Sequence, residues 1–379
     1  MLVVGCGKVG SEIVRDLASS KAVDSVVAVD ANPASLARFT HWPKVETVRA
    51  DLGQKKSLYG LIRQADVVCG ALPGRIGFEL LQLVVEAGRD IVDISYTAKD
   101  PFQLHRKALH NGCTLVPQCG VAPGFTNMCV GDASRRLERM TRVRIFVGGL
   151  PQRPIGPLNY RVVFSLDDVI NEYTRPVRVV EDGDSKVVEP LSGRGFLVFP
   201  GVGKLEYFLT DGLGTLPRSF PKVPDMQELT LRFPGHAEMM NTLRTLGYFE
   251  RRKLKVDHVQ LEPRQLTLEL LQSAFSKGPP EDFLAFRVDV EGLSEGKKIL
   301  VRYQLLDRFD RKNGVSAMAR TTAYPCTSVA LLMGQKRLLG KGVVPPEKIA
   351  QDPEMFSSVL SRLRARGIRP IIQRRIIGS

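Results

Sequence analysis

The sequence predicts an α/β fold, in which a doubly wound parallel sheet is followed by an α+β domain with a mixed or largely antiparallel sheet. Apolar, strand-like runs alternate with helical patterns over residues 1–125. A glycine loop joins the first strand to the first helix. Beyond residue 142, short alternating strands and turns replace the strand-helix alternation. These three observations predict two domains built on different principles.

The glycine loop follows a short apolar strand and has the spacing G-x-G-x-x-G, at Gly5, Gly7 and Gly10. The first glycine allows the tight turn, the second lets the backbone approach a pyrophosphate, and the third lets the helix lie close to the sheet. Asp30 ends the next apolar strand, twenty residues after Gly10. This context predicts a Rossmann domain that binds a dinucleotide.

Four further strands follow in order, so that six strands alternate with helices in this domain. The pattern predicts them at residues 44–48, 65–72, 91–96 and 113–117. Ligands of such sheets lie at the carboxyl ends of the strands. The residues expected to contact the cofactor are therefore Gly5, Gly7, Lys8, Val9, Gly10, Asp30, Asp51, Ala71, Leu72, Pro73, Gly120 and Val121. A plain structural loop is the alternative for residues 71–73.

Asp30 predicts NAD rather than NADP as the cofactor. A carboxylate at this place accepts a hydrogen bond from the ribose 2′-hydroxyl and repels a 2′-phosphate. Arg38, one turn into the next helix, weakens this preference slightly.

The second part of the chain has the pattern of an antiparallel-rich domain over residues 126–316. Strands are expected at 143–147, 160–164, 177–180, 186–188, 206–209, 229–233, 283–290 and 299–306. From residue 317 to 339 the period is again helical, and we expect this helix to pack back on residues 1–125. Residues 317–379 form the predicted C-terminal segment, which ends in a basic tail from Arg362.

The formal net charge is +14, of which about +2 lies before residue 126 and about +12 beyond it. We interpret this excess as solvated helix faces and a basic tail, with a basic rim of a substrate pocket as the alternative. No nucleic-acid motif accompanies the charge, so no nucleic-acid partner is expected.

Six cysteines show no C-x-x-C pair and no histidine spacing suited to zinc, so reduced thiols, a cytoplasmic protein and no metal are expected. The start of the chain lacks the pattern of a secretion signal. No apolar run of 18 residues occurs, so no membrane association is expected.

Several segments, in order, resemble the saccharopine dehydrogenase family, and most closely its lysine 6-dehydrogenase branch. They are Gly-Val-Ala-Pro-Gly at 120–124, Thr-Asp-Gly-Leu at 210–213, Phe-Pro-Gly-His-Ala-Glu at 233–238, Ala-Arg-Thr-Thr at 319–322 and Gly-Val-Val-Pro-Pro-Glu at 342–347. The resemblance covers about residues 1–350. It implies a Rossmann domain and a mixed-sheet domain that binds an amino acid and forms a homodimer.

Three positions separate the chain from parts of that family. Ala122 stands where saccharopine reductases and carboxynorspermidine enzymes carry an acid, which favours the lysine 6-dehydrogenase branch. Asp93, in the segment Asp-Ile-Ser-Tyr, stands where those reductases have a hydroxyl residue. Gly214 replaces an arginine that is usual in relatives, which leaves the substrate open.

The resemblance implies NAD-dependent oxidative deamination of the ε-amino group of L-lysine. The product would be the 6-semialdehyde, which cyclises to piperideine-6-carboxylate, with release of ammonia. One alternative is an oxidoreductase that acts on a secondary amine such as saccharopine or carboxynorspermidine. Another is a dinucleotide-binding sensor without catalysis.

The chemistry needs a base for the lysine ammonium and a proton carrier for imine hydrolysis. Asp93 is the candidate for acting on amine or water, and Tyr96 for orienting or relaying; alternatively, Asp93 accepts from amides at the strand end. His236 is a second candidate base, or else a capping or interface residue.

Arg320 is the candidate for binding the α-carboxylate of the substrate, because a guanidinium offers bidentate geometry. Thr321 and Thr322 follow it with two hydroxyls. Asp211 is expected to bind the α-ammonium, and Asn127 to hydrogen-bond substrate or cofactor. These residues complete the predicted amino-acid site.

Overall fold

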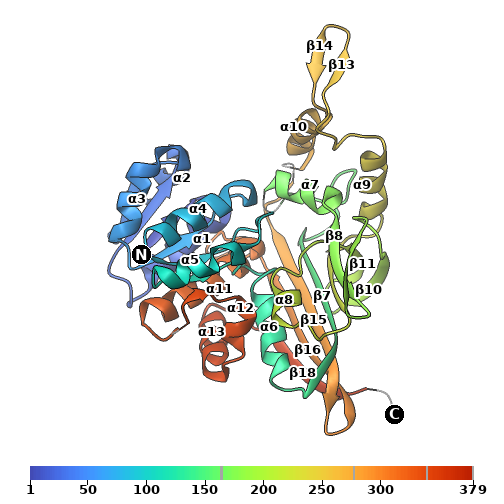
Figure 1. Ribbon diagram of the computed structural model, residues 1–379. Coiled ribbons are helices and arrows are strands. Elements are labelled where there is room, and N and C mark those ends of the chain that lie inside the picture. Colours follow the sequence, from blue (N-terminus) through green and yellow to red (C-terminus); the bar gives the residue numbers. More distant parts are fainter. Residues whose placement is uncertain (163–164, 276–277, 339, 378–379) are drawn as a thin grey trace. The chain divides into compact units, whose positions relative to one another are not determined.

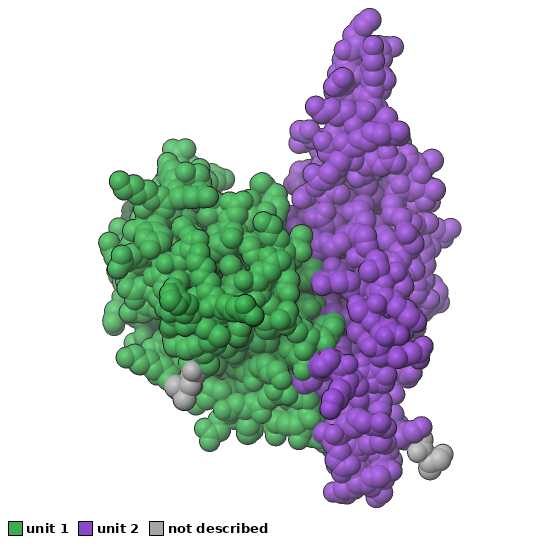
Figure 2. Space-filling view, viewed as in Figure 1, with its two compact units in different colours: residues 1–136, 214–219, 319–369 green, residues 137–213, 220–318, 370–379 purple. Residues whose placement is uncertain are grey.

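The computed structural model describes residues 1–162, 165–275, 278–338 and 340–377. The chain divides into two compact units, coloured separately in Figure 2. The first unit comprises residues 1–136, 214–219 and 319–369. The second comprises residues 137–213, 220–318 and 370–379.

The first unit contains a seven-stranded parallel sheet in the order β17-β6-β5-β4-β1-β2-β3 (Figure 1). Its strands are β1 (Leu2–Val4), β2 (Val26–Asp30), β3 (Val45–Arg49), β4 (Val67–Gly70), β5 (Asp90–Asp93), β6 (Thr114–Val116) and β17 (Gly342–Val343). The predicted parallel Rossmann-type sheet is therefore confirmed. The sixth strand gains a neighbour, β17, from far along the chain.

Helices flank this sheet because each has an apolar face. They are α1 (Lys8–Ser19), α2 (Pro33–Leu36), α3 (Lys55–Gln64), α4 (Gly74–Glu86), α5 (His105–His110) and α6 (Phe125–Ser134), with 3-10 turns η1 (Ala37–Phe39), η2 (Leu52–Gln54) and η3 (Pro101–Leu104). In α1, Ile13, Val14 and Leu17 are fully buried, whereas in α4 Leu80 and Val84 are. Burial of these side chains supplies the main driving force for docking helix on sheet.

The C-terminal part adds further helices to the first unit. They are α11 (Ala317–Gly334), apart from its first two residues, α12 (Pro346–Ala350) and α13 (Pro353–Ala365), together with the short α8 (Leu216–Ser219). Helix α11 ends at Gly334, five residues before the predicted end. Asp352 caps α13 by accepting from the backbone N–H groups of Glu354 and Met355.

The second unit contains a mixed, mainly antiparallel sheet with the main order β10-β11-β12-β7-β15-β16-β18; β8 pairs with β12 and β9. The strands are β7 (Arg139–Pro151), β8 (Val177–Glu181), β9 (Asp184–Val188), β10 (Gly195–Phe199), β11 (Gly203–Leu209), β12 (Met226–Arg232), β15 (Asp282–Ser294), β16 (Lys297–Arg308) and β18 (Ile371–Ile376). Only the β12–β7 pair is parallel among the pairings described for this sheet. The predicted mixed-sheet domain is thus confirmed.

Helices α7 (Leu166–Thr174), α9 (His236–Thr245) and α10 (Pro263–Phe275) belong to the same unit. A two-stranded hairpin of β13 (Leu254–Val256) and β14 (Val259–Leu261) projects from the unit in Figure 1. Leu254, Val256 and Val259 on one face of this hairpin are 40–57% exposed. The hairpin therefore carries an uncovered apolar face within this chain.

Several local predictions differ from the structure. Residues 160–162 form no strand, because the Tyr160 N–H closes a turn onto the Ile155 carbonyl; residues 163–164 lie outside the described residues. The strand predicted at 91–96 ends at Asp93, where the Asp93 carboxyl accepts from the Ser95 N–H.

The division of the chain also differs from the predicted boundaries at 125 and 316. Helix α6 stays with the first unit, as do residues 214–219. The expected basic tail contains a strand instead, because β18 pairs antiparallel with β16 over six residue pairs. Within the described residues, no helix is long and apolar enough to cross a membrane.

Candidate dinucleotide and amine site

The glycine loop has the geometry that its spacing predicts. Gly5 has φ +96, and a Cβ there would lie 2.5 Å from the Ala71 carbonyl oxygen. A Cβ on Gly10 would lie 1.8 Å from the Gly5 oxygen, so only glycine fits. A Cβ on Gly7 would meet nothing within 4 Å. Gly7 thus leaves open space at the start of α1, as the approach of a pyrophosphate requires.

Asp30 is bonded at the end of β2, beside this loop. Its carboxylate accepts from the Cys6 N–H at 2.6 Å and from the Asn32 N–H at 2.7 Å. The exposed Arg38 donates to the Ser11 hydroxyl of α1 at 3.1 Å. Asp30 and Arg38 both interact electrostatically with Cys6, so a negative and a positive side chain lie near the glycine loop. Both cofactor-selecting charges are present.

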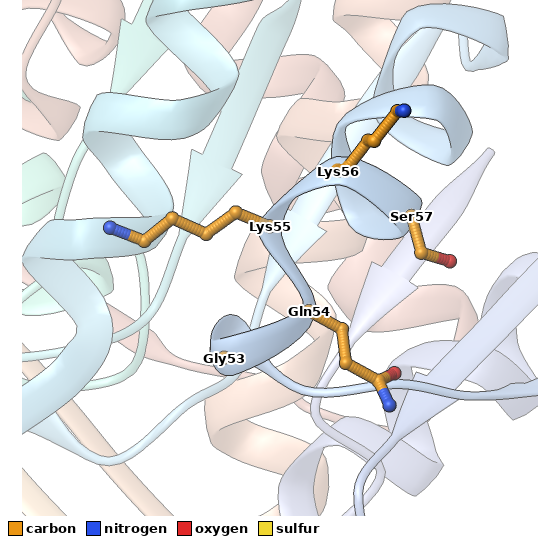
Figure 3. Close-up of a pocket in the computed structure, with 5 residues that line it drawn as sticks. All are labelled: Gly53, Gln54, Lys55, Lys56 and Ser57. Atoms are coloured by element: carbon orange, nitrogen blue, oxygen red, sulfur yellow. The ribbon is translucent and has the colours of Figure 1, made fainter.

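Asp51 follows β3 and caps the turn η2. Its Oδ1 accepts from the Gly53 N–H at 2.8 Å and the Gln54 N–H at 3.1 Å. Next to it lies a surface hollow lined by Gly53, Gln54, Lys55, Lys56 and Ser57, in which the two lysine side chains extend in different directions (Figure 3). The hollow lies past the carboxyl end of β3 and has no acidic residue in its lining.

Asp93 ends β5 and is completely buried. Its carboxyl accepts from the Ser95 N–H at 2.9 Å, and the Ser95 hydroxyl lies 3.1 Å from Oδ1 and 2.9 Å from the Leu72 carbonyl. Burial raises the pKa of Asp93 to about 8, against the lowering effect of the Ser95 hydrogen bonds. A protonated Asp93 satisfies the whole network, since it donates to the Ser95 hydroxyl, which donates to Leu72.

Residues next to Asp93 bring three predicted regions of the first unit together. A Cβ on Gly70 would lie 2.1 Å from the Asp93 Oδ1. The Cys119 N–H donates to the Asp93 carbonyl at 2.7 Å, which places the loop after β6 beside β5. Tyr96, which follows Ser95 in the chain, is half-buried. Asp93 therefore lies where β4, β5 and the loop after β6 meet.

The loop after β6 packs against α11. A Cβ on Gly120 would lie 3.1 Å from the Thr322 Cγ2, and Val121 is buried. Asn127 Oδ1 accepts from the Gly124 N–H at 3.2 Å and so caps the start of its own helix. Thr322 of the predicted substrate set thus lies against Gly120 of the predicted cofactor set.

Arg320 is 8% exposed, and its guanidinium donates to the Arg366 carbonyl at the end of α13. The pKa of the buried Glu12 is raised by burial and lowered by charges that include Arg320. Thr321 is also buried. These contacts tie α11 to α1 and α13, and the role of Arg320 in binding a carboxylate stays a prediction.

His236 belongs to the second unit and is completely buried. Its Nδ1 lies 2.7 Å from the Leu158 carbonyl, which can only accept, so Nδ1 carries the proton. Nε2 then accepts from the Tyr173 hydroxyl at 2.8 Å. Burial and the charge of Arg232 lower the pKa of His236 to about 3. A neutral imidazole with both nitrogens bonded favours the structural interpretation of His236 over a base.

Asp211, also in the second unit, is paired with Arg178. Its Oδ1 accepts from the Arg178 Nε at 3.0 Å. The guanidinium of Arg178 therefore already holds the carboxylate that was expected to bind an α-ammonium.

Two buried charged groups of the second unit escaped prediction. Arg232 is 2% exposed, stacks 4.6 Å over the Tyr160 ring and pairs with Glu172. Burial raises the pKa of Glu228 to about 8, although the Thr210 hydroxyl binds its carboxyl. The alternation of segment 229–233 places Arg232 on the polar face, opposite Leu229, Leu231 and Phe233, so nothing in the sequence signals that Arg232 is buried.

Within the described residues, no group of three histidine, cysteine or acidic side chains is placed to bind a metal ion. All six cysteines are free and buried. Burial raises the pKa of Cys119 far above its usual range, which fits the predicted packing role rather than a nucleophile.

Comparison with known proteins identifies the relatives of the chain. Residues 1–116 match the saccharopine dehydrogenase NADP binding domain, and residues 120–368 match the saccharopine dehydrogenase C-terminal domain. Alpha-aminoadipic semialdehyde synthase of Arabidopsis thaliana is 26% identical over 54% of this chain and 21% of its own length. The mitochondrial synthase of Rattus norvegicus is 22% identical over 97% of this chain and 47% of its own length.

The chain thus spans about half, or less, of the length of these curated relatives. The structure of apo saccharopine dehydrogenase (L-Glu forming) from Saccharomyces cerevisiae superposes with a TM-score of 0.80, at 16% identity, over 100% of this chain and 99% of that one. The likeness establishes the same fold. Two consecutive domain matches and a common fold lead to one conclusion: the chain belongs to the saccharopine dehydrogenase family.

Proposed function

We propose that the protein is an NAD(P)-dependent oxidoreductase that removes the ε-amino group of L-lysine as ammonia. The observation that carries this proposal is Asp93, a buried carboxyl with a pKa raised to about 8 at the carboxyl end of β5. A group that changes protonation near pH 8 suits proton transfer to and from an amine. Family members are oxidoreductases that use a dinucleotide, and the glycine loop fits one.

The proposed reaction begins when the lysine ε-ammonium loses a proton to ionised Asp93. Hydride then leaves C6, and a bound NAD(P)⁺ supplies the chemistry that accepts it. The resulting iminium adds water and releases one proton to solvent. Once its nitrogen is protonated, the carbinolamine loses ammonia, and its hydroxyl proton passes to solvent as the aldehyde forms. Asp93 Oδ1, next to the Ser95 hydroxyl, holds the proton taken from the amine and returns it to the departing nitrogen. The aldehyde cyclises with the α-amine and loses water.

Two observations on the substrate-binding candidates limit how the amino acid can be bound. The Asp211 carboxylate is already paired with Arg178, and the Arg320 guanidinium already donates a hydrogen bond to the Arg366 carbonyl. Binding of a carboxylate by Arg320 therefore requires exchange of that backbone contact for the ligand. Replacing Arg320 by alanine is expected to raise the lysine KM with a smaller effect on kcat; an unchanged KM removes Arg320 from the site.

A second candidate is oxidation of a secondary amine of the saccharopine type. The names of the yeast structure and of the family model favour it, since both are saccharopine dehydrogenases. Ala122 at the place of the reductases' acid favours the primary amine instead.

The cofactor preference that we propose is NAD, supported by Asp30 at the end of β2. The matching family model is described as NADP binding, and Arg38, which interacts electrostatically with Cys6 of the glycine loop, is the cation that would pair with a 2′-phosphate. Kinetics with both cofactors test this choice. Replacing Asp30 by asparagine should weaken NAD more than NADP, and a wild-type preference for NADP would refute the proposal.

We further propose that the protein is a cytoplasmic homodimer that binds an amino acid. Its reduced, buried cysteines support a reducing compartment. The apolar hairpin face of Leu254, Val256 and Val259 supports self-association, because an isolated two-stranded hairpin has little stability of its own. The same face on a second copy would be self-complementary about a two-fold axis.

The test is cofactor reduction in the presence of lysine, ornithine, saccharopine or simple amines. Turnover of lysine with release of ammonia supports the proposal. Turnover of saccharopine with release of glutamate supports the secondary-amine candidate. Binding of a dinucleotide without turnover of any amine supports a sensor and refutes both enzymatic proposals.

A further inference from the structure

Gln118 is a buried residue whose conformation and hydrogen bonding are both unfavourable. It lies two residues after the end of β6, is 5% exposed and has φ +53, a left-handed conformation that a residue with a Cβ seldom adopts. Its side-chain oxygen Oε1 is buried and has no hydrogen-bond partner among the described residues. Each of these features typically costs about 1–3 kcal/mol.

The surroundings of this oxygen lie within the first unit. The next residue, Cys119, is fixed by its N–H to the Asp93 carbonyl at 2.7 Å. A Cβ on Gly214 would lie 2.6 Å from Gln118 Oε1 and 3.2 Å from Pro123 Cβ. The Gly214 backbone therefore packs against Oε1 at a place where no side chain would fit. The backbone that follows Gln118 is thus bonded to Asp93, and Gln118 itself has a strained backbone conformation.

An amide oxygen is a neutral acceptor, so it selects a ligand atom that donates a hydrogen bond. Both proposed ligands carry an N–H at the reacting end: the carboxamide of the nicotinamide ring and the amine of the substrate. A carboxylate or carbonyl in the same place would repel Oε1. The orphan acceptor thus matches the chemistry of either ligand.

We propose that Gln118 Oε1 accepts a hydrogen bond from an N–H of the bound ligand at the reacting end, and so positions that ligand beside Asp93. This inference rests on the proposed function for the existence of a dinucleotide and an amine. Gln118 acts as a positioning residue and takes no proton in the reaction.

The main variant is Gln118→Met, which keeps the side-chain length and removes the acceptor. Gln118→Asn is a second variant, because asparagine tolerates the left-handed backbone and withdraws the oxygen by one carbon. Gln82→Met, at an exposed position of α4, is the matched control. Calorimetric titration with NAD⁺, with NADP⁺ and with the deamido cofactor, in which a carboxylate replaces the carboxamide, measures cofactor binding without turnover.

If the carboxamide is the donor, Gln118→Met should bind the cofactor about 3- to 10-fold more weakly, the equivalent of one neutral hydrogen bond. The wild type should then prefer the amide cofactor over the deamido form, and the variant should lose that preference. If the substrate amine is the donor, cofactor binding stays unchanged and the amine KM rises by the same factor.

Unfolding of the free protein separates positioning from a structural role. Since Oε1 has no partner in the free protein, Gln118→Met should be as stable as the wild type or more stable. The proposal is overturned if Gln118→Met changes neither cofactor affinity nor amine KM. It is also overturned if Gln118→Met loses stability while the control Gln82→Met does not. A wild type that binds no dinucleotide would overturn the proposed function as well, which distinguishes the two failures.

Discussion

Replacing Asp93 by asparagine is expected to stabilise the first unit while it abolishes turnover. The side chain is completely buried, and burial raises its pKa to about 8 from an ordinary value of 3.8. Asparagine reproduces the protonated form: its oxygen can accept from the Ser95 N–H and its amide can donate to the Ser95 hydroxyl. The variant keeps the hydrogen bonds and loses only the ability to ionise.

The magnitude depends on pH, and its sign follows from proton binding. Between the unfolded pKa of 3.8 and the folded pKa of about 8, the folded carboxyl keeps its proton and the unfolded one has lost it. The unfolded chain then binds fewer protons, so the stability of the wild type falls as pH rises through this window. The fall is about 1.4 kcal/mol per pH unit, or about 3 kcal/mol from pH 5 to pH 7. Asparagine shows no such fall.

The assay is urea unfolding at pH 5, 6 and 7, followed by fluorescence of the single tryptophan. Trp42 lies in the first unit, where its ring packs edge-on against Phe39, so its signal reports on the unit that contains Asp93. The stability advantage of Asp93→Asn should grow by about 3 kcal/mol over this range. Asp66→Asn, at an exposed position of the same unit, is the control. An advantage that does not change with pH would refute the reasoning.

The remaining predictions concern the glycine loop, the hairpin and the pH profile. Gly10→Ala should unfold more readily in urea and lose dinucleotide binding, because its Cβ would lie 1.8 Å from the Gly5 oxygen. Gly7→Ala should stay folded yet bind the cofactor more weakly in calorimetry, because its Cβ would enter open space. Equal behaviour of the two variants would contradict the different roles of the two glycines. Val256→Lys should convert the proposed dimer to a monomer in light scattering, since it places a charge on the exposed apolar face; a variant that remains dimeric excludes this interface. The wild-type kcat/KM should rise with pH up to about 8 as Asp93 ionises, whereas a flat profile would argue against Asp93 as the base.

Much of the first unit was predictable because its signals are local. Each glycine of the loop meets a steric demand inside a ten-residue segment, and Asp30 ends a continuous apolar strand. Strand β17 escaped prediction because Gly342–Val343 is too short to show a period. The arginines of β18 interrupt its apolar pattern, so the sequence did not predict a strand there. The strand forms because it pairs with the edge of β16.

The candidate site was less predictable because side-chain roles depend on distant residues. Asp93 was identified at the end of its strand, yet its raised pKa comes from complete burial, which the sequence does not show. His236 resembles a base in sequence, but Leu158 and Tyr173 occupy both of its ring nitrogens. Gln118 carried no motif at all, and its orphan oxygen becomes visible only once the loop after β6 is folded.

The most direct test of the account is the stoichiometry of a single reaction with L-lysine. Cofactor reduction and released ammonia are measured together, in the wild type and in Asp93→Asn. Oxidative deamination with Asp93 as the base predicts one ammonia for each NAD(P)H formed and no turnover in the variant. Reduction of cofactor without ammonia, or full activity of Asp93→Asn, would contradict it.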